Sequence, residues 1–347
     1  MITKFATDNG LANYRIEQFN KQYYQNLIGS FSELTTWPKT LREKLIAEVD
    51  FSSLEFEKEV ISAKGNTHKV LFKRKLDGQR IETVLMRHKD NRNTVCISCM
   101  VGCPVGCVFC ATGKMGFGGN LTTKEIIDQV LYFQRLLNKS AQKLTNIVFM
   151  GMGEPMLNLV NVKEAISILT AENKLGFSQR RITISTSGYI PQFNQLVESG
   201  FRGRVAISLH APNQELRAKL MPVAKIYPLD KLLAALDDYT LLTNKRVSYE
   251  YVLIKGVNDL DIHALQLVEL FANRLAHINL IPYNPIKEES FVRTTKTQMD
   301  SFTGILDDYN MNYTIRVTMG DDVNAACGQL ADRENTKHKD NKIKITI

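Results

Sequence analysis

Three cysteines stand at a spacing that suits metal chemistry. Residues 99–110 read CMVGCPVGCVFC, and within this stretch Cys103, Cys107 and Cys110 follow the pattern C-x3-C-x2-C. Three thiolates on one short loop can hold a [4Fe-4S] cluster and leave one iron open to an exchangeable ligand. A tetrahedral zinc site needs a fourth ligand, and neither a second C-x2-C pair nor an H-x3-H pair follows in the chain. The spacing therefore favours an iron–sulfur cluster over zinc or a chance run of core cysteines.

The composition describes a chain that can fold without disulfides. Its 347 residues suffice to bury a large α/β core. Residues 1–4 lead into polar residues rather than an apolar signal segment, and no run approaches the ~18 apolar residues of a membrane span. We therefore expect a soluble, monomeric protein of the reducing cytoplasm, where thiols remain available for chemistry.

The charge favours a polyanionic partner. The formal net charge is +8, and Lys and Arg side chains bind nucleic acid by neutralising its phosphates. Residues 333–347 carry five Lys and Arg against two Asp and Glu. This segment is typical of a solvated, flexible tail, with RNA contact as the alternative.

The segments before the cysteine loop predict a helical module and a hairpin. Apolar residues recur at helical spacing from residue 14 to residue 48, and the second helical segment, LREKLIAEV, follows Pro38. Between His68 and His88, two β-rich runs flank Asp77 and Gly78, which is a strong hairpin signal. We expect this hairpin to connect the helical module to the rest of the chain.

After Cys110 the sequence alternates between strand and helix. The runs TNIVFMGM, RRITISTSG, RVAISLH, RVSYEYVLI and HINLIPY are short and rich in β-branched residues, and helix-like segments such as NVKEAISILTAEN follow most of them. This alternation predicts a parallel sheet with helices outside, closed fully or partly into a barrel. Polar and Gly-rich residues gather at the strand ends MGMGEP, STSG, SLH and PYNP, the end that carries chemistry in such barrels.

The cysteine pattern, with the aromatic Phe109 before its last cysteine, resembles the radical-SAM superfamily. The resemblance implies that the open iron binds the amino and carboxylate groups of S-adenosylmethionine, which is then cleaved reductively to a 5'-deoxyadenosyl radical. The MGMGEP segment supports this interpretation, because its glycines allow close backbone approach and Glu154 can bind the methionine ammonium. A GEP sequence alone indicates only a tight turn, so its place one strand after the cysteines matters.

Longer motifs extend the resemblance over nearly the whole chain. Together, eight motifs resemble those of the radical-SAM enzymes that methylate C2 of adenosine in 23S rRNA and tRNA. These motifs are VCIS, CVFCATGKMGF, FMGMGEPMLN, ISTSG, ISLHAPN, GVND, NLIPYNP and GDDVNAACGQL. The resemblance implies an α/β fold with a partial (β/α)6 radical-SAM barrel over residues 93–332. It further implies a helical RNA-binding domain over residues 1–60, a β-hairpin connector over residues 61–92 and a basic flexible tail over residues 333–347.

The same resemblance implies cofactors and partners. One [4Fe-4S] cluster is expected on the three loop cysteines, and two molecules of S-adenosylmethionine are expected to be consumed per methylation. The partners it implies are 23S rRNA at the peptidyl transferase centre, tRNA at the adenosine 3' of the anticodon, an electron donor such as flavodoxin or ferredoxin, and a thiol reductant. The cofactor contacts carried over are Gly153, Glu154, Ser185, Ser208, Leu209, His210 and Asn284.

Three further residues carry over as catalytic. The resemblance implies that Cys327 takes a methyl group from one S-adenosylmethionine, and that the deoxyadenosyl radical from a second removes hydrogen from it. The methylene then adds to adenine, Glu82 accepts the ring proton, and Cys96 resolves the adduct by forming a disulfide with Cys327. Taken alone, Glu82 is typical of a solvated strand face, Cys327 of a buried thiol and His210 of a hydrogen-bonded core histidine.

Some features depart from the family or leave alternatives open. Cys99 stands where the family has a small polar residue and is interpreted as a bystander. The loop at residues 285–295 has less Gly and Pro than its relatives, which puts RNA contacts there in doubt, whereas Arg87, Lys114 and Arg316 are candidate exposed RNA contacts.

A sister family methylates C8 of the same rRNA adenosine and confers antibiotic resistance. We prefer the hypothesis that C2 is methylated, because Pro155 follows Glu154 and Ser187 precedes Gly188. The resistance enzymes look different at these two places. One alternative function is a non-catalytic iron–sulfur or zinc RNA-binding module, but such a module would not require Cys96 and Cys327. Another is a radical enzyme that acts on glycyl residues or small molecules, but such an enzyme would not require the helical module.

Overall fold

The structure is a computed structural model that describes residues 2–286, 290–316, 319–325 and 328–330. Cys327 and the basic tail of residues 333–347 therefore lie outside the described residues. Within the described part, no helix is long and apolar enough to cross a membrane.

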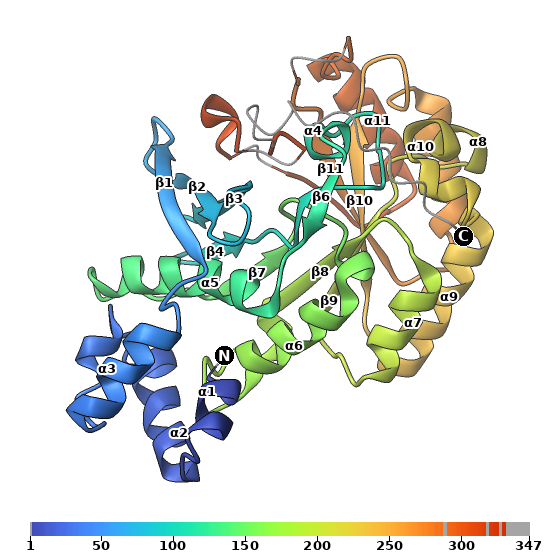
Figure 1. The fold of residues 1–347 in the computed structure, drawn as a ribbon. Helices are drawn as coiled ribbons and strands as arrows, with labels where there is room; N and C mark the ends of the chain where they lie inside the picture. Colours follow the sequence, from blue (N-terminus) through green and yellow to red (C-terminus); the bar gives the residue numbers. More distant parts are fainter. Residues whose placement is uncertain (1, 287–289, 317–318, 326–327, 331–347) are drawn as a thin grey trace.

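A mixed sheet forms the centre of the molecule (Figure 1). Its strands follow the order β1-β2-β3-β4-β7-β8-β9-β10-β11-β12, and the two ends of this order do not pair with each other among the described residues. A small second sheet pairs β5 with β6. The strands are β1 (Leu54–Ile61), β2 (Thr67–Arg74), β3 (Arg80–Arg87), β4 (Asn93–Cys96), β5 (Met100–Gly102), β6 (Phe117–Asn120), β7 (Asn146–Phe149), β8 (Ile182–Thr186), β9 (Arg204–Ser208), β10 (Val247–Leu253), β11 (Ala276–Pro282) and β12 (Tyr313–Ile315).

The main sheet changes direction at β4. Strands β1 to β4 pair antiparallel, whereas β4, β7, β8, β9, β10, β11 and β12 all run parallel. Because the parallel strands point the same way, the loops at their carboxyl ends meet at one rim, and this rim carries the site described below. The sheet is an open, partial barrel, as the alternation of strands and helices predicts.

Helices connect the parallel strands and cover their outer face (Figure 1). A capping box starts the helix that begins at Thr123: the Thr122 side chain accepts from the Glu125 backbone, and the Glu125 side chain accepts from the Thr122 backbone at 2.7 Å. The helices are α1 (Thr3–Asp8), α2 (Asn13–Asn20), α3 (Lys39–Glu48), α4 (Ala111–Lys114), α5 (Thr123–Asn138), α6 (Leu159–Thr170), α7 (Ile190–Glu198), α8 (Gln214–Leu220), α9 (Leu229–Thr243), α10 (Asp261–Phe271) and α11 (Lys296–Asp308).

Four strands were not expected from the sequence: the short pair β5 and β6, and the edge strands β1 and β12 of the main sheet. Residues 54–60, which were assigned to the helical module, form most of β1, a largely exposed edge strand that pairs antiparallel with β2. At the other edge, the three-residue β12 adds a seventh parallel strand to the six predicted. Helix α3 and the hairpin of β2 and β3 around Asp77 and Gly78 are confirmed.

The N-terminal helices pack on the barrel through a buried carboxylate. Asp128 on α5 accepts hydrogen bonds from the Ser53 backbone and hydroxyl, both at 2.6 Å, and from Lys124 at 2.9 Å. Tyr23 donates to the same carboxylate at 3.4 Å. One acidic side chain thus joins the helical module, the segment before β1 and the first barrel helix.

Replacing Asp128 by alanine is expected to loosen this module. The change leaves several buried donors without a partner, so the free energy of unfolding should fall by about 2–4 kcal/mol. Urea titration followed by tryptophan fluorescence measures this directly, because the single tryptophan, Trp37, is buried within the module. Ser52→Ala, which removes a 3.3 Å contact to Asp128 and local hydrogen bonds to the Leu54 backbone but keeps the carboxylate, is the control and should have a smaller effect. An unchanged fluorescence midpoint for Asp128→Ala would contradict the prediction.

Candidate active site

The cysteine loop lies between β5 and α4. Gly102 ends β5 with a φ of +65°, and a Cβ there would stand 1.9 Å from the Gly116 carbonyl oxygen, so only glycine fits. The next amide, of Cys103, donates to that same carbonyl at 2.8 Å. At the far end of the loop, the Ala111 amide donates to the Gly328 carbonyl at 2.9 Å. The loop is therefore fixed at both ends by backbone contacts.

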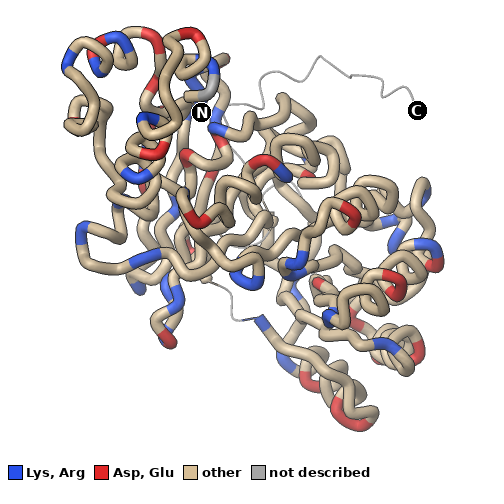
Figure 2. Tube along the Cα trace, turned by 90° about the horizontal axis from the view of Figure 1, so that it is seen from below, with Lys and Arg blue, Asp and Glu red and all other residues tan. Residues whose placement is uncertain are grey.

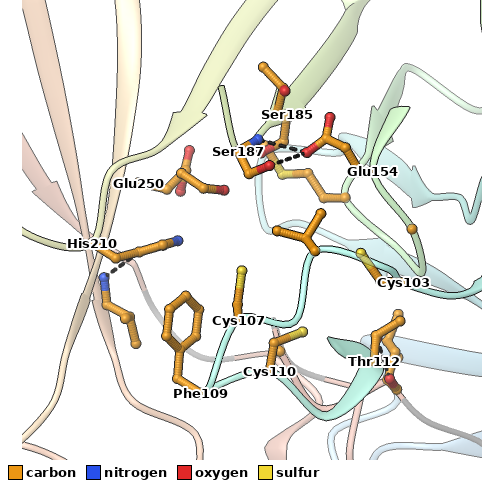
Figure 3. Close-up of a pocket in the computed structure, with 18 of the residues that line it drawn as sticks. Cys103, Cys107, Phe109, Cys110, Thr112, Glu154, Ser185, Ser187, His210 and Glu250 are labelled. Atoms are coloured by element: carbon orange, nitrogen blue, oxygen red, sulfur yellow. Dashed lines mark hydrogen bonds between the residues drawn. The ribbon is translucent and has the colours of Figure 1, made fainter. Parts of the chain in front are cut away.

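This loop forms one wall of a pocket at the carboxyl ends of the parallel strands (Figure 3). The three cysteines of the C-x3-C-x2-C motif all line the pocket, which confirms that the loop and the strand ends converge. The other predicted site residues that line it are Gly153, Glu154, Ser185, Ser208 and His210. Leu209 instead packs in the hydrophobic core beside them.

The thiols suit an iron–sulfur cluster better than a single metal ion. No three Cys, His, Asp or Glu side chains in the described residues stand close enough to share one ion, as a tetrahedral zinc site requires. A cubane of four irons is wider than one ion and accepts ligands that stand further apart. Burial raises the pKa of Cys103 and Cys107, so both become thiolates only beside added positive charge, which iron supplies.

Glu154 is a buried carboxylate at the end of β7. Its Oε2 accepts from the Ser187 amide and hydroxyl, both at 2.7 Å, and its Oε1 accepts from the Met156 amide at 3.0 Å. Burial raises the pKa of Glu154, and these hydrogen bonds oppose that shift. Gly153, with a φ of +103°, lets the chain pass Met100, because a Cβ would stand 2.6 Å from the Met100 Cβ. A carboxylate oriented in this way can bind an ammonium group.

His210 closes the pocket on the side of β9 and β10. Its Nδ1 accepts from the Val252 amide at 3.0 Å, and its ring lies 4.7 Å from that of Phe109. Burial, aided by the charge of Arg217, lowers the pKa of His210 to about 3. The imidazole is therefore neutral at physiological pH.

This pKa predicts a pH effect on stability. The unfolded chain takes up a proton at His210 as the pH falls below ~6.5, whereas the folded chain does not until about 3. The neutral imidazole therefore adds to the free energy of unfolding above pH ~6.5, and this contribution is lost as the pH falls toward about 3. Between pH 6 and pH 5, the free energy of unfolding should fall more steeply in the wild type than in His210→Gln, by about 1 kcal/mol per pH unit.

Denaturant titrations over this pH range test the prediction. Val252→Ala is the matched control, because it changes a neutral neighbour of His210 and should lower stability without changing the slope. Equal slopes for the wild type and His210→Gln would show that His210 titrates normally.

Arg217 is a buried cation behind the pocket that the sequence did not single out. It is fully buried, and its Nη2 donates to the carbonyls of Ser187 at 2.7 Å and Ser208 at 3.3 Å. Burial lowers its pKa to about 10, and the proximity of Cys107 opposes this shift. The guanidinium thus links the loops that follow β8 and β9 and stands near the cysteine loop. In the sequence, Arg217 is one Arg in a short helical segment after SLHAPN, and this pattern is too common to mark it as a functional residue.

A second cavity adjoins the first, and Met150, Ile281 and Leu330 line both. Cys96, at the end of β4, lies in its wall, as do Ala325 and Asn284. Asn284, predicted as a cofactor contact, therefore lines the neighbouring cavity, and its Oδ1 accepts from Arg293 at 2.9 Å.

Glu82 is buried on β3, unlike the solvated face residue that its sequence context alone indicates. It pairs with Lys69 at 2.8 Å, and Lys69 also donates to the Asn324 carbonyl at 3.1 Å. Glu82 lies two residues before Val84, the strand partner of Cys96. Glu82 is thus connected through Lys69 to Asn324 and lies on the strand that pairs with Cys96.

The described cysteines form no disulfide with one another. Cys99 is fully buried and lines neither cavity, and burial raises its pKa, all of which fits a bystander.

In the part of the chain that the structure describes, basic and acidic residues are mixed along the trace, as Figure 2 shows. The candidate RNA contacts Arg87, Lys114 and Arg316 are half-buried rather than exposed, and Arg316 lines the second cavity. The sequence could not reveal this, because the burial of each side chain depends on how its strand, helix or loop packs in the fold.

Comparison with known proteins agrees with this architecture. Residues 97–268 match the sequence profile of the Radical SAM superfamily. The solved structure of a radical SAM methyltransferase from Sphaerobacter thermophilus superposes with a TM-score of 0.91, at 43% identity, covering 94% of this chain and 95% of that one. Fold and site together define a radical SAM methyltransferase, a class that works with a [4Fe-4S] cluster and S-adenosylmethionine.

Two curated relatives narrow the class. The dual-specificity RNA methyltransferase RlmN of Dictyoglomus thermophilum is 44% identical over 322 residues, covering 92% of this chain and 91% of that protein. RlmN of Geobacillus kaustophilus is 42% identical over 335 residues, covering 96% and 90%. The chain belongs to the RlmN family of radical SAM RNA methyltransferases.

Proposed function

We propose that this enzyme methylates C2 of an adenosine in 23S rRNA, and of the adenosine 3' of the anticodon in tRNA, through a methylated cysteine and a transient protein–RNA adduct. The observation that carries the proposal is the second cavity, which Cys96 lines and which shares Met150, Ile281 and Leu330 with the cofactor pocket. Ala325, Gly328 and Leu330, which flank Cys327 in the chain, line these two cavities. A target base in the second cavity would thus lie beside Cys96 and next to the cofactor pocket.

The cluster and S-adenosylmethionine, when bound, would supply a methyl group, the one-electron chemistry that removes a hydrogen atom from it, and the acceptor for the electron released when its carbon is joined to adenine. Cys327 carries the methyl on its sulfur, and its carbon becomes bonded to C2 of adenine. Glu82 accepts the proton that C2 loses. The Cys96 thiolate then attacks the Cys327 sulfur, so a disulfide forms, the sulfur–carbon bond breaks and the carbon is protonated to a methyl group. A thiol reductant restores both cysteines.

The ligand roles follow the geometry of the first pocket. Cys103, Cys107 and Cys110 would hold the cluster, and Glu154 would bind the methionine ammonium beside it. Ser185, Ser208 and His210 line the remaining wall toward the nucleoside. The N-terminal helices would contact the folded RNA, with the target base flipped out of its stack.

Nucleoside mass spectrometry tests the proposal. Anaerobically reconstituted enzyme is incubated with S-adenosylmethionine, a reductant and either a 23S rRNA fragment or an anticodon stem-loop, and the RNA is digested. We expect 2-methyladenosine from both substrates. Finding 8-methyladenosine instead would overturn the choice of carbon, and methylation of the rRNA fragment alone would overturn the role in tRNA.

A further inference from the structure

Glu250 is a buried carboxylate in the cofactor pocket that neither the motifs nor the proposed mechanism use. It lies in the middle of β10, only 5% exposed, and lines the same pocket as the cysteine loop. Its strand neighbours in register are Ser208 on β9 and Asn279 on β11. Side chains in register on parallel strands point to the same face, so these three form one polar row inside the barrel.

One oxygen of Glu250 is occupied and the other is not. Oε1 accepts from the Asn279 side chain at 2.8 Å and pairs with Arg316 at 3.3 Å. Oε2 has no hydrogen-bond partner among the described residues, although it is buried. Leaving a buried acceptor unpaired is unfavourable, so a bound ligand that supplies a donor would recover this lost interaction.

The position of Glu250 indicates which part of a ligand it meets. Figure 3 shows Glu154 and Glu250 on different sides of the pocket, with Ser185 and Ser187 between them. Glu154 follows β7, and three strand spacings of ~4.8 Å separate β7 from β10, about 14 Å along the wall. If the methionine ammonium binds Glu154, then Glu250 meets the nucleoside end of S-adenosylmethionine.

The hydroxyls of the ribose are the donors that best match this carboxylate. Ser208, the in-register neighbour of Glu250, makes this part of the wall polar, whereas Val252 and Ile281 beyond it offer an apolar surface for the adenine ring. Dinucleotide-binding folds likewise hold a ribose hydroxyl with an acidic side chain. We propose that Glu250 Oε2 accepts a hydrogen bond from a ribose hydroxyl of S-adenosylmethionine and thereby fixes its nucleoside.

This inference rests on the proposed cofactor pocket but not on which carbon of adenine is methylated. Its test is therefore a binding measurement rather than an activity. Equilibrium dialysis on anaerobic holoenzyme compares S-adenosylmethionine with its 2'-deoxy and 3'-deoxy analogues. The wild type should bind at least one analogue about tenfold more weakly, the effect of one hydrogen bond to a charged group.

Glu250→Gln should remove this preference. Asn279 and Arg316 both donate, so they orient the glutamine oxygen toward themselves and leave its NH2 facing the pocket. The variant should bind S-adenosylmethionine about tenfold more weakly and the analogue almost as the wild type does. Glu250→Ala is a second test and should lose the preference in the same way. Iron content and circular dichroism confirm that each variant is folded.

Asn279→Ala is the matched control, because it removes a partner of Oε1 and leaves Oε2 in place, and it should retain the preference. A wild type that does not discriminate, or a Glu250→Gln that still discriminates, would overturn the inference. Equal weakening of S-adenosylmethionine and both analogues would likewise assign Glu250 a structural role. Failure of the wild type to bind S-adenosylmethionine would overturn the pocket as well, whereas 8-methyladenosine in the RNA would overturn only the proposed carbon.

Discussion

Replacing any one of Cys103, Cys107 and Cys110 by alanine should give a folded protein that no longer holds iron. The three thiols lie on a loop fixed by backbone contacts at both ends, so loss of one leaves the loop in place but removes a third of the ligands. The wild type should bind about four irons per chain and the variants only a small fraction of that. Methylation should fall by more than about 100-fold, because the cofactor has no iron to bind.

Iron analysis and visible absorption after anaerobic reconstitution measure this effect. Cys99→Ala is the control, because Cys99 is a buried thiol four residues from Cys103 that lines neither cavity. It should retain wild-type iron and absorption. If Cys99→Ala lost iron to the same extent, the cluster would be ligated differently. Zinc in place of iron in the wild type would revive the alternative that the spacing left open.

The second large effect is expected at the two outlying cysteines. Cys327→Ala should abolish methylation, by more than about 100-fold, and form no covalent product with RNA, because no sulfur carries the methyl group. Cys96→Ala should form the protein–RNA adduct but fail to release it, because no thiol attacks the Cys327 sulfur. Both variants should bind iron like the wild type, since neither residue belongs to the cysteine loop.

Denaturing gel electrophoresis with labelled RNA distinguishes the two variants. Cys96→Ala should shift the RNA to a protein-linked band that withstands thiol reductants, since it contains a sulfur–carbon bond and no disulfide. Cys96→Ala with Glu82→Gln is a further comparison, because loss of the proton acceptor should reduce the band. A protein-linked band with Cys327→Ala, or normal turnover by Cys96→Ala, would contradict the assigned roles.

Much of the fold could be predicted because its signals are local. Period-2 and period-3.6 apolar patterns predicted the hairpin, the parallel strands and helices such as α6. The exceptions include the short pair β5 and β6 and the two edge strands of the main sheet. β1 is largely exposed and β12 has three residues, so neither carries the long apolar run that marks a strand, and pairing with a neighbour stabilises each of them.

The candidate site divides in the same way. The spacing of Cys103, Cys107 and Cys110 and the sequence around Glu154 determine the chemistry of one loop and one strand end, because ligand type and backbone turns depend on neighbours in the chain. Parallel strands bring their carboxyl ends to one rim, so even the meeting of these segments could be predicted.

Only the tertiary structure decided what surrounds them. Cys96 and Asn284 both line the second cavity, and Glu82 is buried against Lys69. These positions depend on strand register and on contacts between segments that are distant in the sequence. Arg217 and Glu250 are ordinary charged residues in the sequence. Burial makes them consequential, because a charge removed from water must find its partners in the fold, and no local pattern records which residues the fold will bring to it.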